Sequence, residues 1–313
     1  MKAIQFLALT ALGAALFASC SNEEELTRGS YPNDNIIRVT AGVNNMTRGN
    51  EATTALNKDF SLNVVNSTND NYSYANEIFS LKGGTEWSST NKLLWENLAT
   101  PVEIVALYPA TDANTFAGVF SKTGNTYGTI SYGVKPDQST RDDANDLLLY
   151  HNTSFVPKND LENGKLDIQF KHAFCRVDIE VTIGSEFNAT NGLAANPIQG
   201  IKVEGTKTTA KIGFTPTAPF FTVTPSASGE VTSIIPTTDD FTPAASATDQ
   251  ARAKYSCIVI PQTATLKVLL HTSDREYEWT GTEMALESGK QYTLQLTMKK
   301  SATTRNFILR ERK

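Results

Sequence analysis

Short apolar segments with a period of two recur along most of the chain. Between residues 173 and 183 the odd positions are apolar, whereas the even positions hold Phe, Arg, Asp, Glu and Thr. From 292 to 298, Tyr, Leu, Leu and Met alternate in the same way with Thr, Gln and Thr. This period turns one side-chain face toward a core and the other toward water, as in a β-strand. The clearest predicted strands are 36–43, 60–65, 102–108, 146–150, 166–170, 173–183, 255–260, 266–271 and 291–298.

Turn-forming residues separate these segments. Examples are Lys82-Gly83-Gly84, Asn163-Gly164, Asn191-Gly192 and Ser288-Gly289, which supply the backbone conformations that tight turns need. No long segment keeps its apolar residues at helical spacing. Many short strands without intervening helices predict an all-β fold built from antiparallel β-sandwiches.

The length of 313 residues suits about two such domains. A polar, turn-rich stretch at 151–165 separates two groups of strands. We therefore expect an N-terminal β-sandwich at 36–157, a C-terminal β-sandwich at 158–300 and a basic tail at 301–313.

The first twenty residues have the pattern of a targeting segment. Lys2 precedes an uncharged, mostly apolar run from Phe6 to Phe17, which is shorter than the roughly 20 residues that span a bilayer. The following Ala18-Ser19-Cys20 resembles a bacterial lipobox, in which small residues give access to a cysteine that is acylated. We expect 1–20 to be a lipoprotein signal peptide and Cys20 to be the lipidation site. A plain secretory signal with an incidental cysteine is the alternative.

An acidic run follows this cysteine, within a polar stretch at 21–35 that we interpret as a linker. Ser21 and Asn22 precede three glutamates, and the run resembles the export signal that sends Bacteroidetes lipoproteins to the outer face of the outer membrane. The alternative is an ordinary solvated linker. No later segment is long and apolar enough to span a membrane, so the acyl chains would be the anchor.

Composition narrows the function classes. Apolar residues make up 40% of the chain, enough for a packed core. The 28 basic and 33 acidic residues give a formal charge of −5 without a basic cluster, which argues against a nucleic-acid partner. Cys175 and Cys257 lie in apolar strand-like runs and are expected to be buried free thiols, although a disulfide between them stays open.

Catalytic and metal-binding patterns are sparse, so we expect no enzyme activity, no cofactor and no metal site. His172 lies on one strand face with Phe170 and Phe174, where a structural role is favoured. The run Asp142-Asp143-Ala144-Asn145-Asp146 matches a magnesium-binding D-D-x-x-D pattern, which needs a helix to place carboxylates on one face. Here it leads into a strand and is interpreted as an acidic loop, with weak calcium binding left open.

Three tryptophans raise a sugar-binding alternative, because exposed aromatic rings can stack on saccharides. Trp95 ends an apolar run and Trp279 alternates with Tyr277, so both are expected in a core or at its edge. Trp87 follows the Gly83-Gly84 turn and is the one tryptophan for which exposure is considered, but a core role is favoured for all three.

An ordered set of segments resembles the fimbrillin superfamily, in particular the Mfa-like fimbrillins of Bacteroidetes. The resemblance covers roughly residues 36–298 and rests on these segments: Leu94-Trp95, Val102–Pro109, Asp146-Leu147-Leu148, Phe170–Val177, Ile260-Pro261-Gln262 and Gly289–Leu294.

The resemblance implies two transthyretin-like β-sandwich domains in tandem and a structural or adhesive pilus subunit. Such a subunit is exported as a lipoprotein of the outer membrane, is cut after an arginine beyond its first strand, and joins other fimbrillin subunits by β-strand exchange in a surface fimbrium. A host or bacterial surface ligand would be a further partner. The basic tail has a short apolar run, Phe307-Ile308-Leu309, which leaves stalk, tip and anchor subunits open. The alternative is a surface glycan-binding lipoprotein.

The first strand then defines the expected site. Ile37, Val39, Ala41 and Val43 share its apolar face and are expected to fill the groove that strand removal opens. Three arginines lie close enough to this strand in the sequence to be the cleavage site. Arg28 precedes the strand and Arg38 lies within it, whereas Arg48 follows it in a turn-rich segment, where proteases cut most readily. We expect cleavage between Arg48 and Gly49.

Overall fold

A computed structural model describes residues 34–43, 56–84, 86–110, 128–215, 217–218, 220–227 and 231–300, together with the backbone of 303–304 and 310–311. The expected signal peptide and nearly all of the linker, with Cys20 and Arg28, lie outside the described residues. So does the segment 44–55, which contains Arg48 and Gly49.

Strands form most of the described part, which confirms the all-β prediction in its coarse form. The helical elements described are one four-residue helix, α1 (Pro157–Asp160), and short 3-10 turns. The strands are β1 (Val39–Val43), β2 (Phe60–Val65), β3 (Tyr74–Gly83), β4 (Glu86–Ser89), β5 (Val102–Tyr108), β6 (Thr129–Gly133), β7 (Leu148–Phe155), β8 (Leu166–His172), β9 (Cys175–Ile183), β10 (Gly200–Glu204), β11 (Thr209–Phe214), β12 (Phe221–Pro225), β13 (Thr237–Thr242), β14 (Ala251–Val259), β15 (Gln262–His271), β16 (Glu276–Leu286), β17 (Gln291–Met298), β18 (Thr303–Thr304) and β19 (Arg310–Glu311).

The N-terminal strands close on themselves into a barrel, in the order β1-β4-β3-β2-β5-β7-β8. Its inward side chains form one core, in which Phe60, Leu62, Ile104 and Phe170 are completely buried. The chain begins and ends this barrel with β1 and β8, which are hydrogen-bonded neighbours. We call this unit the N-terminal barrel.

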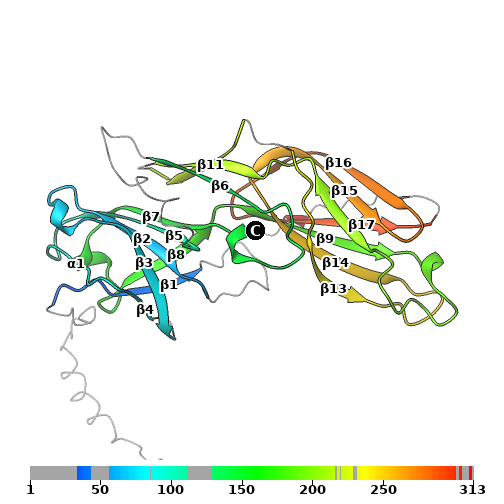
Figure 1. The fold of residues 1–313 in the computed structure, drawn as a ribbon, viewed down its shortest axis with the longest axis horizontal. Coiled ribbons are helices and arrows are strands. Elements are labelled where there is room, and N and C mark those ends of the chain that lie inside the picture. The colour runs from blue at the N-terminus through cyan, green and yellow to red at the C-terminus, as the bar shows by residue number, and fades with distance from the viewer. Residues whose placement is uncertain are drawn as a thin grey trace, which may run out of the picture.

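The remaining strands form three sheets around a second core. In Figure 1, β9 and β13 to β17 lie on the right, whereas β6 and β11 lie above the middle. Their orders are β10-β15-β16, β12-β11-β6 and β13-β14-β9-β17, and the short C-terminal strands β18 and β19 both pair with β17. The odd positions of β9 and the even positions of β17 are buried, as the period of two predicts. We call this unit the C-terminal half.

Strands β5 and β7 form a wall between the two cores. In β5, Ile104 and Ala106 face the core of the N-terminal barrel, whereas Val105 and Leu107 face the other core. Both faces of this wall are therefore buried, and the two units share it instead of being joined by a mobile linker.

The chain leaves the N-terminal barrel for the last time between His172 and Cys175, not at residue 157. Strand β8 lies beyond the expected boundary, yet it pairs with β1 and β7 of the barrel. Strand β6 lies before that boundary, yet it pairs with β11 of the C-terminal half. The polar stretch at 151–165 reflects the end of β7, α1 and the Asn163-Gly164 turn, whose φ angles are 50° and 73°.

The sequence predicted antiparallel sandwiches, but not every pair of strands is antiparallel. Strand β1 runs parallel to β8, and β9 runs parallel to β17. Each pair joins segments far apart in the sequence, where no tight hairpin imposes the antiparallel direction. A periodic pattern identifies the strands but does not specify the direction of such long-range pairs.

A buried polar contact fixes the wall to the C-terminal half. The side chain of His151 on β7 is 0% exposed, and its Nε2 lies 2.7 Å from Oε1 of Glu103 on β5. Its Nδ1 lies 2.9 Å from the carbonyl oxygen of Phe220, which can only accept, so Nδ1 is the donor. The ring also meets Phe214 and Phe220 edge-on.

Replacing His151 with Ala is expected to lower the free energy of unfolding by about 3 kcal/mol, because it leaves the largely buried Glu103 carboxylate without this partner. Urea unfolding measures the change. Lys254→Ala is the control, since Lys254 and Glu180 are 3.9 Å apart and both exposed, and such a pair is worth about 1 kcal/mol or less. Equal effects of the two substitutions would contradict a stabilising role for the His151 contact.

Candidate functional site

Strand β1 lies in a slot between β8 and β4. It pairs with β8 at five positions, from Val39 opposite Leu166 to Val43 opposite Phe170. On its other side it pairs with β4 at only two positions, where Val39 and Thr40 face Trp87 and Glu86. Strand β1 is therefore the element that joins these two strands and closes the barrel.

The residues just before β1 extend this pairing. The amide of Ile37 donates to the carbonyl of Leu93 at 3.0 Å, and the amide of Trp95 donates to the carbonyl of Asn35 at 2.8 Å. The structure begins β1 one residue after Arg38, but the Arg38 carbonyl still accepts from the amide of Leu166 at 2.8 Å. The backbone of Arg38 is thus bound into the barrel.

One face of this first segment packs into the barrel core, as its pattern predicts. Ile37 is 5% exposed and Val39 is 2% exposed, and Ala41 and Val43 are partly buried against the same core. This core contains a cluster of aromatic rings, in which the centroid of Phe60 lies 5.0 Å from Trp87, 5.4 Å from Phe79 and 5.6 Å from Phe170.

The other face of the first segment carries polar contacts. Oγ1 of Thr40 donates to Oδ1 of Asp167 on β8 at 2.9 Å. Arg38 forms an ion pair with Asp34, with 2.6 Å between Nη2 and Oδ2. The hydrogen bond from this guanidinium lowers the pKa of Asp34 to about 2. Both groups are partly exposed, so this local pair contributes little to stability.

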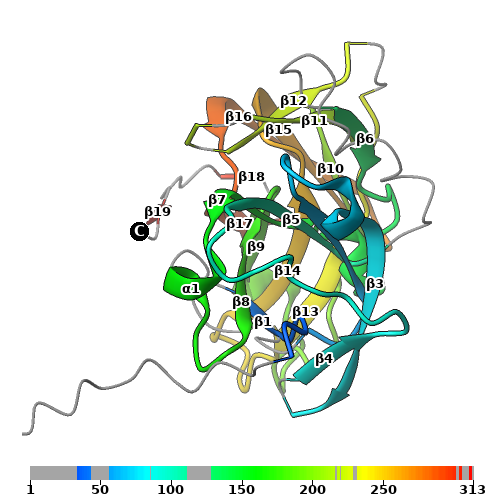
Figure 2. The same ribbon diagram turned by 90° about the vertical axis from the view of Figure 1, so that its left-hand side faces the viewer.

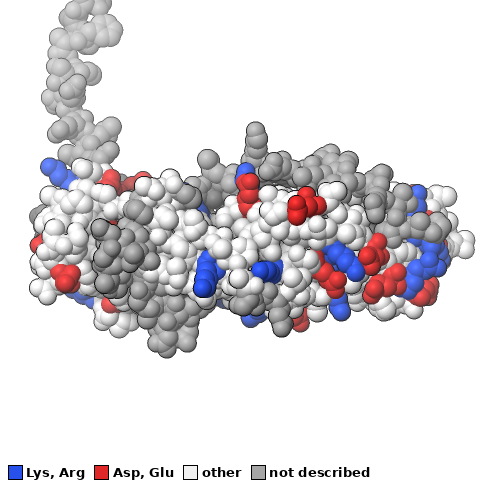
Figure 3. Space-filling model, turned by 90° about the horizontal axis from the view of Figure 1, so that it is seen from above, with Lys and Arg blue, Asp and Glu red and all other residues white. Residues whose placement is uncertain are grey.

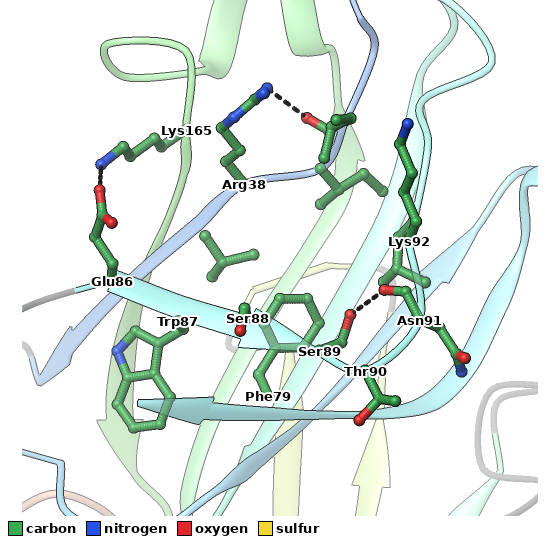
Figure 4. Close-up of a pocket in the computed structure, with 14 residues that line it drawn as sticks. Arg38, Phe79, Glu86, Trp87, Ser88, Ser89, Thr90, Asn91, Lys92 and Lys165 are labelled. Carbon is green, nitrogen blue, oxygen red and sulfur yellow. Dashed lines mark hydrogen bonds and ion pairs between the residues drawn. The ribbon is translucent and has the colours of Figure 1, made fainter. Parts of the chain in front are cut away.

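A cavity of about 390 Å³ lies where β1 and β4 separate. It is lined by 36–39, Phe79, 86–93 and Lys165. Figure 4 shows Lys165 of the turn before β8 and Glu86 of β4 extending toward each other beside the ribbon of β1. Their Nζ and Oε1 atoms are 2.5 Å apart, so an ion pair joins the two neighbours of β1.

The tryptophans do not form an exposed platform. Trp95 and Trp279 are 3% and 5% exposed, which confirms their expected core positions. Trp87 is also only 5% exposed, so the core role favoured for all three tryptophans is confirmed and the exposed alternative for Trp87 is not. The nearby Gly83-Gly84 turn suggested a surface position, but β4 directs the Trp87 ring inward onto Phe60.

The remaining polar candidates have structural partners. Asp142 pairs with Lys58 and Lys135 and accepts the amide of Ala144, and these bonds hold its pKa well below the usual range. Asp146 pairs with the buried His172. The D-D-x-x-D run thus caps a 3-10 turn instead of lining a helix face. Among the described residues, no group of three or more His, Cys, Asp or Glu side chains is arranged to hold a metal ion.

The two internal cysteines are buried as thiols and are not joined in a disulfide, as predicted. Sγ of Cys175 lies 3.1 Å from the carbonyl oxygen of Val259. Burial raises the pKa of the Cys257 thiol far above its ordinary value, so this thiol is unreactive at neutral pH.

Basic and acidic side chains are interspersed on the surface. Figure 3 shows them mixed over the described part of one face, most densely at the end formed by the C-terminal half. No helix in the described part of the chain is both long and apolar enough to cross a membrane.

Sequence reasoning missed two contacts that hold the slot together, Lys165 with Glu86 and Thr40 with Asp167. The partners are 79 and 127 residues apart in the sequence. Neither pair forms a motif, because only the barrel topology brings its members together.

Comparison with known proteins agrees with this all-β architecture. The family model described as fimbrillin-like matches residues 40–308. No curated protein matches the chain. A candidate cell adhesion protein from Bacteroides uniformis has a similar fold, with a TM-score of 0.59 and 15% identity over 89% of this chain and 99% of its own. One from Bacteroides ovatus has a TM-score of 0.57 and 15% identity over 90% and 97%.

The chain belongs to the Mfa-like fimbrillin family, as its sequence resemblance predicted. Members of this family are structural proteins of cell-surface fimbriae and not enzymes. The expectation that this chain is not an enzyme is confirmed by that membership.

If β1 is an integral part of the barrel, Val39→Ala will lower the free energy of unfolding by about 2 kcal/mol, because the substitution leaves a small cavity in the core. Urea unfolding of the full chain measures this change. Arg38→Ala is the matched control in the same segment and should cost less than about 1 kcal/mol, since it removes a partly exposed ion pair. A Val39→Ala variant as stable as the parent would show that the slot does not need β1.

Proposed function

We propose that this fimbrillin is a structural or adhesive pilus subunit that is exported as a lipoprotein on Cys20 and assembled by proteolysis-dependent strand exchange. The observation that carries the proposal is the position of β1. It closes the barrel between β4 and β8, and the segment 44–55 that follows it contains Arg48.

A cut after Arg48 would detach β1 together with Cys20 from the rest of the chain. Of the three arginines, Arg28 precedes β1, so a cut there would leave the strand in place. Arg38 has its carbonyl bonded to β8, so a protease would have to pull this backbone out of the barrel. Arg48 follows Val43, the last residue of β1, in the sequence, so a cut there would remove the whole strand.

Loss of β1 would leave a groove that favours a replacement strand. The facing edges of β4 and β8 would lose their partner, and the space of Ile37, Val39, Ala41 and Val43 would open. Burial of one Val or Ile side chain contributes roughly 1.5–3 kcal/mol. A strand from a neighbouring fimbrillin could restore both the pairing and the burial, which is β-augmentation.

Other expectations remain part of this proposal. The two units are proposed to be transthyretin-like domains, and the precursor is proposed to be anchored in the outer membrane before cleavage. A host or bacterial surface ligand is proposed as a further partner. The alternative, a surface glycan-binding lipoprotein, loses the support expected from an exposed row of tryptophans, since all three are buried.

Arginine-specific protease added to the purified full precursor is expected to give a product whose N-terminal residue is Gly49. Arg48→Ala should abolish this product and prevent assembly, because β1 then stays in the slot. N-terminal sequencing and electron microscopy of cells provide the two measurements. Arg28→Ala is the matched control and should leave both unchanged.

Lipid labelling extends the same experiment. Labelled palmitate should be found on the precursor, be absent from the product that starts at Gly49, and be absent from a Cys20→Ala precursor. Fibres assembled normally by the Arg48→Ala variant would contradict a cut at Arg48 as the step that opens the groove. Acyl labelling of the Cys20→Ala variant would contradict the anchor.

A further inference from the structure

A second cavity lies on the other side of β8, where β7 and β8 separate. These strands pair at only two positions, Leu148 with His172 and Leu149 with Lys171. Figure 2 shows α1 beside the two strands at this place. The cavity has a volume of about 620 Å³, which is within the range of about 300–1,000 Å³ of ordinary small-molecule sites.

The lining of this cavity, which we call the β7–β8 cavity, is polar and carries no basic side chain. Its polar members are amides and carboxylates, and its apolar members are aromatic rings and one leucine. The residues are Tyr150, Asn152, Phe155, Asn159, Asp160, Leu161, Glu162, Asn163, Asp167 and Gln169.

The half-buried Tyr150 lies among these polar groups. Burial raises the pKa of its hydroxyl, a side-chain hydrogen bond with Asn152 opposes this rise, and the carboxylates of Asp167 and Asp160 add to it. Asp167 is held in place by Thr40 at 2.9 Å and by Gln169 at 2.7 Å. Asp160 accepts the amide of Val156 at 2.6 Å. The carboxylates are therefore positioned by the protein, not left as mobile surface groups.

This chemistry matches an uncharged saccharide. Each sugar hydroxyl both donates and accepts, so it suits a site in which amide donors stand beside carboxylate acceptors. Phe155 is buried, so the half-buried Tyr150 is the lining ring that can offer an apolar face to the C–H groups of a sugar ring. Three carboxylates without a basic residue disfavour sialylated, sulfated or phosphorylated ligands.

An extended peptide is the competing occupant, because the separated strands present backbone edges. Peptides that add to an edge gain specificity from pockets for alternate side chains. Of the lining residues with apolar surface, Phe155 and Leu161 are buried in the barrel core and Tyr150 is partly buried against it, so they offer a peptide side chain little surface. The polar lining favours the saccharide.

We propose that the β7–β8 cavity binds an uncharged saccharide and gives this fimbrillin a glycan-recognition site of its own. The site needs no exposed tryptophan. It also does not require β1 to leave, since Asp167 is oriented by Thr40 while β1 is in place.

The test uses the full chain on an array of neutral, sialylated and sulfated oligosaccharides, followed by calorimetry with a neutral glycan that is retained. Tyr150→Phe removes only a hydroxyl, and Asn152→Ala removes one amide. Each is expected to weaken binding about tenfold, the effect of one or two lost hydrogen bonds. Lys171→Ala is the control on β8, because Lys171 is exposed and outside the lining, and it should bind like the parent. Melting curves verify that each variant is folded.

Several results would overturn the proposal. The first two are an array on which the protein binds no neutral glycan and an array on which it binds anionic glycans alone. The third is binding of a neutral glycan that neither Tyr150→Phe nor Asn152→Ala weakens. Selection of strand-forming peptides from a peptide library, with binding that depends on Tyr150 and no binding of glycans, would assign the cavity to a peptide instead.

Discussion

Every strand of a closed barrel has to be hydrogen-bonded along both of its edges. In this fimbrillin β1 meets that requirement for its two neighbours, because it pairs with β4 on one side and with β8 on the other. The strand is five residues long and joins β4 to β8. Its backbone completes the ring, and Ile37 before it and Val39 within it cover part of the barrel core. Without this strand, two edges and an apolar groove would face water, which is unfavourable unless another strand takes its place. The proposed assembly by strand exchange depends on this local constraint.

The division into two cores explains how the molecule could lose a strand and keep its structure. No β1 residue belongs to the core of the C-terminal half, whereas β5 and β7 contribute side chains to both cores. The shared wall is held by burial on both faces and by His151 between Glu103 and Phe220. The C-terminal half would therefore keep its packing and support the wall of the opened barrel. Strand β8 has β1 on one side and the β7–β8 cavity on the other, so the two sites lie on opposite edges of one strand.

Local sequence patterns predicted where most strands lie, but not which strands pair with one another. Alternation identified β9 and β17, and the apolar face of residues 37–43 packs inward as expected. Strands such as β13, with two acidic residues in Thr-Thr-Asp-Asp-Phe-Thr, lack a clear alternating pattern and were missed. The boundary at 157 placed β8 in the wrong unit, because pairing of β1 with β8 joins residues more than 120 positions apart. The inward turn of Trp87 and the contact of Lys165 with Glu86 follow from the same long-range topology, which a single sequence does not encode in any local signal.

Peptide complementation of a truncated chain tests the central claim most directly. A chain that starts at Gly49 lacks β1, and a synthetic peptide of residues 34–43 supplies it. The account predicts that the truncated chain alone self-associates or melts at a lower temperature than the full chain. Addition of the peptide should restore a monomer and raise the melting temperature, whereas a peptide with Val39→Asp should not, because a charge would enter the core. A truncated chain that is monomeric, melts like the full chain and ignores both peptides would contradict the claim that β1 closes a groove that must be filled.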